Sequence, residues 1–247
     1  MNLRGKNVVI TGAAKRIGRE IALTLAQRGA NILVHHRSSA REAAGLCRQI
    51  RTLGVTAETV ACDFGRSAGL AAAVQKFWRK AEKAIGSVDV LVNNASLYYS
   101  TAFGKVTEKA WDELLAVNLK APFFLAQAAG RSMLKRKRGK IISLADWALA
   151  RPRRGFLPYT ASKAGLVSMT LSLAVDLAPH VQVNAVAPGP ILPAAGAKAS
   201  ENAKVVQQTL LKKFGTPRDI ARAVLFLIES DYVTGAVIPV DGGSSIA

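Results

Sequence analysis

Hydrophobic and polar residues alternate along this chain with two different periods. Short runs rich in β-branched residues, typical of buried strands, are separated by longer segments whose apolar residues recur at the i, i+3 and i+4 positions of a helix face. The seven predicted strands span residues 7–11, 31–35, 55–62, 88–93, 140–144, 181–186 and 236–240. The predicted helices begin near Ile17, Ala40, Ser67, Thr107, Pro158 and Pro217. Because strands and helices follow one another in turn, the pattern predicts an α/β fold of Rossmann type, a doubly wound parallel sheet of about seven strands with helices on both faces.

The composition indicates a single folded domain over residues 1–247. Half of the residues are hydrophobic and 20% are charged, which excludes a disordered basic tail protein. The longest apolar runs, such as Ala221–Ile228, are much shorter than the ~20 residues of a membrane-spanning helix. Cys47 and Cys62 have neither CxxC spacing nor nearby histidines, so we expect no metal site and two buried, reduced thiols. No apolar signal segment precedes the first strand, so we expect a cytoplasmic protein.

The chain is strongly basic, with 34 Lys and Arg against 16 Asp and Glu and a formal charge of +18. This charge by itself permits nucleic acid, a membrane surface or an acidic substrate as a partner. The cations are spread from Arg4 to Arg222, and the sequence has no helix-turn-helix, zinc-ligand or aromatic-basic RNA motif. We therefore expect neither nucleic acid nor membrane as a partner, and a solvated surface for the run 135–140.

The first strand leads into a glycine-containing turn, Thr11-Gly12-Ala13-Ala14-Lys15-Arg16-Ile17-Gly18. Two glycines between a strand and a helix let backbone amides approach a pyrophosphate at the positive helix end. The second strand ends in His36-Arg37-Ser38, where cations and a hydroxyl suit the 2′-phosphate of NADPH better than the 2′-hydroxyl of NADH. Asp63-Phe64 and Asn94-Ala95-Ser96 follow the third and fourth strands, at the edge where a dinucleotide binds.

A second group of reactive side chains follows the fifth strand. Asp146 comes directly after it, and Tyr159 and Lys163 lie further on at i and i+4 of a predicted helix. Residues at this spacing share one helix face. We expect the Lys163 ammonium to lower the pKa of the Tyr159 phenol, which would make this tyrosine an acid usable at neutral pH.

Over nearly its whole length the chain resembles the short-chain dehydrogenase/reductase family. The resemblance rests on the glycine turn, Asp63, Asn93-Asn94-Ala95, Val117-Asn118-Leu119, Tyr159-x-x-x-Lys163, 184–189 (Asn-Ala-Val-Ala-Pro-Gly) and 240–243 (Val-Asp-Gly-Gly). It implies an NAD(P)-dependent oxidoreductase in which Tyr159 protonates the substrate, Lys163 holds the nicotinamide ribose, and Asn118 anchors a water relay. The implied cofactor contacts are Gly12, Lys15, Arg16, Ile17, Gly18, His36, Arg37, Ser38, Asp63, Phe64, Asn94, Ala95, Ser96, Tyr159, Lys163, Pro188, Gly189 and Ile191.

Two positions depart from the commonest pattern of this family. Asp146 stands where the family usually has a serine, and an ionised carboxylate would repel an oxygen that gains negative charge. A carboxyl group suits a reaction in which a ring nitrogen receives a proton. The second departure is Arg16 in the glycine turn, and both resemble the pteridine reductase branch. That branch implies an aromatic ring at Tyr98 stacked on the substrate, and a substrate site built from Arg16, Ser96, Tyr98, Asp146 and Tyr159.

These observations predict an NADPH-dependent reductase that converts a pterin or dihydropterin to its tetrahydro form. The alternative is a carbonyl or 3-oxoacyl-thioester reductase, in which Arg131 and the run 135–138 dock an acidic acyl carrier protein. The family implies a homotetramer, which the apolar segment Ala164–Leu177 fits, although burial within one subunit explains that segment equally well. We expect the segment around 190–214, with a helix over 204–212, to cover the substrate. Arg151, Arg153 and Arg154 are placed to attract an anionic substrate tail.

Overall fold

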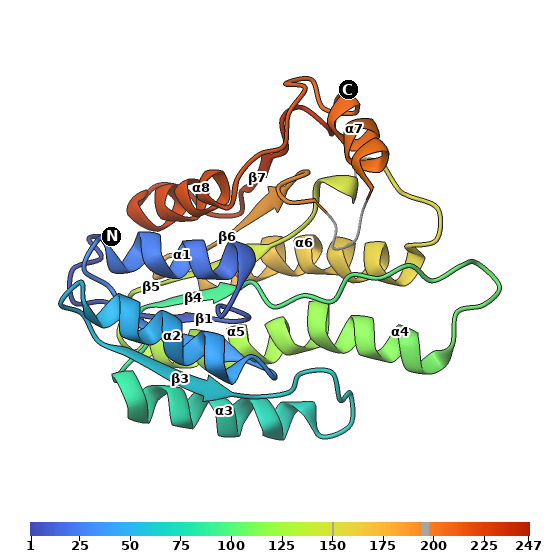
Figure 1. The fold of residues 1–247 in the computed structure, drawn as a ribbon. Coiled ribbons are helices and arrows are strands. Elements are labelled where there is room, and N and C mark those ends of the chain that lie inside the picture. The colour runs from blue at the N-terminus through green and yellow to red at the C-terminus, as the bar shows by residue number, and fades with distance from the viewer. Residues whose placement is uncertain (150, 194–197) are drawn as a thin grey trace.

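Seven strands pair in parallel in one sheet (Figure 1). Their order across the sheet is β3 (Ala57–Ala61), β2 (Asn31–His36), β1 (Asn7–Ile10), β4 (Val90–Asn93), β5 (Gly139–Leu144), β6 (Val181–Pro188) and β7 (Val237–Val240). The chain builds outward from β1 to β3 and then returns to add β4 on the other side of β1. At such a switch point the loops after the two central strands diverge and leave a crevice at their carboxyl ends.

The structure is a computed structural model that describes residues 1–149, 151–193 and 198–247. The sheet is covered on both faces by helices. One face packs against α1 (Arg16–Ala26), α2 (Ala40–Arg51) and α8 (Pro217–Glu229), and the other against α3 (Leu70–Ile85), α5 (Ala121–Lys135) and α6 (Leu157–Leu177). Alternate residues of β1 enter the two cores: Val8 and Ile10 pack with the first set of helices, and Val9 packs with the second. The predicted doubly wound fold is confirmed.

The predicted elements agree with the observed ones to within a few residues at their ends. Two helices begin where the sequence provides caps: the hydroxyl of Thr107 accepts from the amide of Ala110 at the start of α4 (Glu108–Leu115), and Thr216 caps α8 in the same way. Two short helical segments were not predicted, η1 (Ala116–Lys120), a π-helix, and η2 (Trp147–Leu149), a 3-10 helix. The first contains Asn118, and the second directly follows Asp146.

The helix expected over 204–212 is wrong in its position. The observed helix is α7 (Ala199–Gln207), and the chain turns after it. The Thr209 hydroxyl bonds back to the carbonyl of Val206 at 2.9 Å, and Lys212 has a left-handed φ of 51°, so the helix cannot continue. Residues 194–197 of the expected covering segment lie outside the described residues.

The cysteines are both free, but only one is buried. Cys47 lies in the core, whereas Cys62 is half-buried at the end of β3. The prediction of two buried thiols is therefore correct for Cys47 alone. Within the described parts of the chain, no helix is both long and apolar enough to cross a membrane.

Candidate active site

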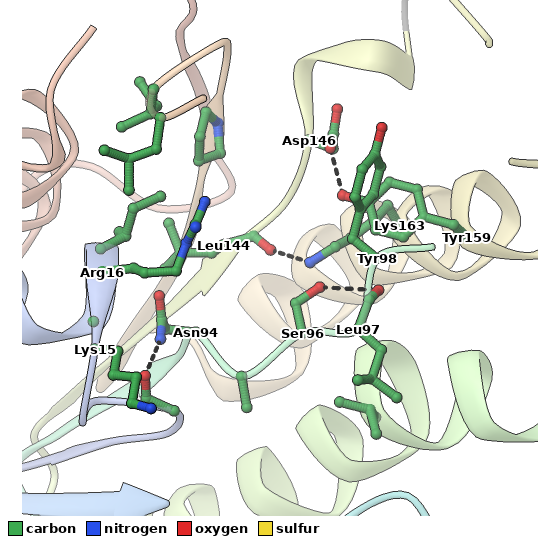
Figure 2. A pocket seen from close by; sticks show the side chains of 18 of the residues that line it. Lys15, Arg16, Asn94, Ser96, Leu97, Tyr98, Leu144, Asp146, Tyr159 and Lys163 are labelled. Carbon is green, nitrogen blue, oxygen red and sulfur yellow. Dashed lines mark hydrogen bonds between the residues drawn. The ribbon is translucent and has the colours of Figure 1, made fainter. Parts of the chain in front are cut away.

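A cavity of about 790 Å³ opens at the carboxyl ends of the strands. The loops after six strands contribute to its wall, and Figure 2 shows Asp146, Tyr159 and Lys163 across the cavity from Lys15 and Arg16. Every predicted site residue except Asn118 lines it: Gly12, Lys15, Arg16, Ile17, Gly18, His36, Arg37, Ser38, Asp63, Phe64, Asn94, Ala95, Ser96, Tyr98, Asp146, Tyr159, Lys163, Pro188, Gly189 and Ile191. The sheet topology thus brings together residues that are up to 179 positions apart, from Gly12 to Ile191.

The glycine turn is held tightly against the loop that follows β4. The side-chain amide of Asn94 donates to the carbonyls of Thr11 at 2.7 Å and Gly12 at 3.0 Å. A Cβ atom on Gly18 would lie 2.5 Å from the Gly12 carbonyl oxygen, and Gly12 has a left-handed φ of 62°. No side chain caps the start of α1, so its first backbone amides face the cavity end without a side-chain acceptor. These amides form an anion site of the kind that binds a pyrophosphate.

The two asparagines after β4 have different environments. The side-chain amide of Asn94 braces the turn, but that of buried Asn93 has no hydrogen-bond partner among the described residues. Of the two asparagines, Asn94 alone therefore joins the loop after β4 to the turn. We find no contact that explains the polar side chain at Asn93.

His35 connects the glycine turn to the loop after β3, a role that the sequence did not reveal. Its Nδ1 accepts from the amide of Gly12 at 3.0 Å, and its Nε2 lies 3.0 Å from the carbonyl of Cys62. Both bonds can form only if the ring is neutral with its proton on Nε2. Burial lowers the pKa of His35 to about 4, which keeps the ring neutral, and the ring stacks on Phe64 with centroids 4.4 Å apart. Its place directly before His36 at a strand end was the only signal available.

The side chains at the expected 2′-phosphate position suit an anion. The Nδ1 of His36 is buried and has no partner in the described parts of the chain, while Arg37 and Ser38 are exposed beside it. Lys15 forms an ion pair with Glu42 at 2.6 Å. Nearby, the Asp63 carboxylate accepts from the amide of Gly65 at 2.9 Å and so shapes the turn after β3.

Tyr159 and Asp146 are hydrogen-bonded to each other in the cavity. The Tyr159 hydroxyl donates to Oδ2 of Asp146 (Figure 2). The other carboxylate oxygen, Oδ1, accepts from the amide of Ala148 at 2.6 Å. Because η2 begins directly after Asp146, its first turn fixes the carboxylate in place. Burial, followed by the charge of Asp146, raises the pKa of Tyr159 well above its ordinary value.

The expectation that Lys163 lowers the pKa of Tyr159 is therefore wrong for this structure. The Lys163 ammonium donates to the carbonyl of Leu144 at 2.7 Å and lies 6.0 Å from the centre of the Tyr159 ring. Burial lowers the pKa of Lys163 itself to about 8, an effect that the charge of Asp146 partly offsets. The negative neighbour of the phenol outweighs the positive one because Asp146 is hydrogen-bonded to the hydroxyl and the ammonium is not.

Asn118 lies outside the cavity wall, in the π-helix η1, and is fully buried. Its Oδ1 accepts from the Ser96 hydroxyl at 3.0 Å and the Leu97 amide at 2.8 Å. Its Nδ2 donates to the Leu97 carbonyl at 3.0 Å and the Ser162 hydroxyl at 3.1 Å. With these four bonds the side chain positions the loop after β4 against the catalytic helix α6.

Tyr98 lies at the outer part of the cavity in an aromatic cluster. Its ring stacks on Phe156 with centroids 4.8 Å apart and meets Tyr159 edge-on at 4.8 Å. Of the three arginines expected near the substrate, Arg153 lines the cavity, whereas Arg151 and Arg154 are exposed and absent from its wall. The sequence did not single out Trp147, Phe214 or the α7 residues Glu201, Asn202 and Val205, which also line the cavity.

Comparisons with known proteins agree with this arrangement. Residues 12–245 match a family model described as enoyl-(acyl carrier protein) reductase. The chain is 36% identical over 245 residues to the 3-oxoacyl-(acyl-carrier-protein) reductase FabG of Staphylococcus aureus strain Mu50, covering 96% of this chain and 97% of that protein. It is 33% identical over 253 residues to the 5-keto-D-gluconate 5-reductase of Escherichia coli K12, covering 100% of this chain and 98% of that protein.

Two solved structures share the fold along almost the whole chain. A blue fluorescent protein from a metagenomic library, crystallised in complex with NADPH, superposes with a TM-score of 0.90 at 35% identity, covering 99% of each chain. A Sinorhizobium meliloti protein described as a short-chain alcohol dehydrogenase superposes with a TM-score of 0.91 at 34% identity, covering 98% of this chain and 97% of that one.

Proposed function

The chain belongs to the short-chain dehydrogenase/reductase family and is an NADP-dependent oxidoreductase, and we propose that its substrate is a pterin or dihydropterin reduced to the tetrahydro form. The family alone does not select the substrate. The relatives named above differ in the group that their names say they reduce, an oxoacyl, an enoyl or a keto-sugar group. The choice must therefore come from the residues around the reacting position.

The residues present fit an NADPH molecule. The amides at the start of α1 suit the pyrophosphate, and the partnerless Nδ1 of His36 with Arg37 and Ser38 suits the 2′-phosphate. Lys163 uses one of its three N–H donors on Leu144, which leaves two for ribose hydroxyls. When bound, NADPH supplies the hydride for reduction.

The pairing of Asp146 with Tyr159 carries the proposal. Reduction of a ketone generates negative charge on an oxygen, and a carboxylate beside the proton donor opposes that charge. Reduction of a carbon–nitrogen double bond instead requires a proton at nitrogen, and no oxyanion forms. The hydrogen-bonded pair of Tyr159 and Asp146 supplies this proton, and Asp146 takes part in the relay that restores it. Arg16 and Tyr98 are positioned at the cavity wall to hold a planar ring.

A second candidate is the reduction of a 3-oxoacyl thioester. The names of the relatives favour it over pterin reduction, since the S. aureus protein is named as such a reductase and none of the relatives named above is a pterin reductase. In this reading Asp146 is protonated and replaces the serine donor. Arg131 and the exposed members of the run 135–138, Lys135, Lys137 and Arg138, would then face an acidic carrier protein, whereas Arg136 is half-buried and pairs with Asp89. The expectation of a solvated surface over 135–140 is wrong for Lys140, which is buried and donates to Asp231.

Steady-state kinetics with NADPH separates the two candidates. We expect kcat/KM for 7,8-dihydrobiopterin to exceed that for an acetoacetyl thioester by at least about tenfold, a difference of about 1.4 kcal/mol in transition-state stabilisation. An equal margin in favour of the thioester would refute pterin reduction. In the variant Asp146→Ser, pterin reduction should fall while thioester reduction is kept or rises. A parallel loss of both activities contradicts the assigned role of Asp146.

Three further proposals concern the oligomeric state, the location and the substrate-covering segment of the enzyme. We propose that the enzyme is a homotetramer, because Leu171 and Val175 of α6 are 46% and 79% exposed and form an uncovered apolar strip. We propose that it works in the cytoplasm, which suits two free thiols. We also propose that residues 190–193 and 198–214 cover the substrate, since α7 contributes Glu201, Asn202 and Val205 to the cavity.

A further inference from the structure

Arg153 is a half-buried cation that lines the substrate end of the cavity. It forms no ion pair with any carboxylate in residues 1–149, 151–193 and 198–247. Its charge is therefore available to a ligand of opposite charge in the cavity.

Two aromatic side chains fix the Arg153 guanidinium in place. Its carbon lies 4.9 Å from the centre of the Trp147 ring, and its Nη1 donates to the Tyr98 hydroxyl at 3.2 Å. A guanidinium has five N–H groups, and this is its only hydrogen bond to another residue that the structure describes. The remaining donors keep the fork geometry that binds carboxylate or phosphate through two parallel bonds.

The cofactor does not account for this charge. The cations assigned to the 2′-phosphate follow β2, whereas Arg153 comes after β5, which lies three strands away across the sheet. At about 4.8 Å per strand the separation is roughly 14 Å. Arg153 is instead close to the reacting hydroxyl, because it bonds to Tyr98, whose ring touches Tyr159 edge-on, and its charge acts to lower the pKa of Tyr159.

The acidic residues at this end of the cavity have other partners. Asp146 accepts from Tyr159 and from the amide of Ala148, and Glu201 accepts from the amide of Lys198 at the start of α7. Neither carboxylate forms an ion pair with Arg153 within 4.0 Å.

We propose that Arg153, held by Trp147 and Tyr98, binds a carboxylate or phosphate group on the tail of the substrate, remote from the ring that is reduced. This inference rests on the proposed pterin reduction and adds that anionic pterins are preferred over neutral ones. The anion has two possible sources, a glutamyl carboxylate of a folate-type tail and a phosphate ester on a short side chain. Both present two oxygens to the guanidinium fork.

Calorimetric titration of the NADP⁺-loaded protein tests the preference. One arm compares methotrexate, a pteridine with a glutamate tail, with its dimethyl ester, and a second arm compares dihydroneopterin monophosphate with dihydroneopterin. We expect the charged member of at least one pair to bind roughly 10- to 150-fold more tightly, as for a charge-assisted hydrogen-bonded pair. The arm with the larger ratio identifies the source of the anion.

Variants assign that preference to one side chain. Arg153→Gln should reduce the ratio to about one, Arg153→Lys should give an intermediate ratio because it keeps the charge without the fork, and Arg154→Gln should leave the ratio unchanged. Arg154 is the matched control because it is an exposed neighbour outside the cavity wall. Unchanged NADP⁺ affinity in each variant establishes that the protein remains folded.

The outcomes separate this inference from the proposed function. If pteridines bind but the charged and neutral members of both pairs bind equally, the role of Arg153 is refuted while pterin reduction stands. If the ratio persists in Arg153→Gln, another cation is responsible and the inference is also refuted. If no pteridine binds to the NADP⁺-loaded protein, pterin reduction itself is refuted, and the preference falls with it.

Discussion

Replacing Asp146 by asparagine removes one charge from the site and changes little else. Asparagine has nearly the same volume, and its carbonyl oxygen can still accept from the amide of Ala148, as Asp146 does at 2.6 Å. The variant should therefore fold normally. What it loses is the charge-assisted bond from the Tyr159 hydroxyl.

The size of the effect follows from that single bond. A hydrogen bond to a charged group contributes about 1.5–3 kcal/mol, and about 1.4 kcal/mol corresponds to tenfold in rate, so kcat for pterin reduction should fall roughly 10- to 150-fold. Reduction of an oxo thioester, if it occurs at all, should not fall, because a neutral amide no longer repels an oxyanion.

The pH profile gives a second and independent result. The charge of Asp146 raises the pKa of Lys163, while burial lowers it to about 8. If the ammonium form is required, kcat/KM declines as pH rises through about 8 in the wild type. In Asp146→Asn the pKa of Lys163 falls, so the decline should begin at a lower pH.

The fall in kcat and the pH at which kcat/KM declines are both measured in stopped-flow or steady-state assays with dihydrobiopterin and NADPH over a range of pH. A variant whose pterin turnover stays within about twofold of the wild type would falsify the proton relay, since the bond it removes contributes more than that. A break in the profile that moves to higher pH contradicts the electrostatic coupling between Asp146 and Lys163.

Three further predictions concern the cofactor end. Burial lowers the pKa of His35 from 6.5 to about 4, so between these pH values the folded state binds fewer protons than the unfolded state. In urea unfolding, this residue should therefore make the protein about 2 kcal/mol less stable at pH 5 than at pH 7. The variant His35→Gln should lack this loss. Gly18→Ala places a methyl group 2.5 Å from a backbone oxygen and should abolish NADPH binding in a fluorescence titration. In the control Gly45→Ala, within helix α2, the nearest side-chain atom to the added methyl group is 3.8 Å away, so the free energy of unfolding should rise by about 1 kcal/mol. Arg37→Gln should raise KM for NADPH roughly 10- to 150-fold and leave KM for NADH almost unchanged; an equal effect from Arg41→Gln, which is exposed on α2, would mean that net charge rather than a specific contact is responsible.

The sequence predicted the fold and most of the cavity wall because both follow from local pattern. Alternation of strand and helix periods requires the doubly wound sheet, and that sheet gathers residues after successive strands at one edge. The spacing of Tyr159 and Lys163 alone places them on one helix face, and the glycines of the turn indicate that the backbone there lies close to neighbouring atoms. None of these conclusions needs the partner of a side chain to be known.

The errors arose where a tertiary partner decides the outcome. The spacing of Tyr159 and Lys163 suggests that the pKa of the phenol is lowered. Burial and the hydrogen bond to Asp146, which the turn at η2 makes possible, raise this pKa instead. Asn118 makes four hydrogen bonds to three residues in two segments, and no period in the sequence connects them. The α7 residues of the cavity wall come from a segment with few local landmarks, where the helix starts five residues before the expected position. Packing, rather than propensity, determines such details.

The four hydrogen bonds of Asn118 divide the site into a fixed frame and exchangeable parts. They join the loop at Ser96 and Leu97 to α6 through Ser162, so the walls that carry Tyr98 and Tyr159 are held together from behind, outside the cavity. Residues 151–156 and 198–214 take no part in these bonds, yet they supply Arg153 and Phe214 to the opening. Loop grafting within these two segments should therefore change which substrates are accepted while leaving the proton-transfer geometry intact. In such grafts, Asn118 and the residues to which it is hydrogen-bonded should be left unchanged.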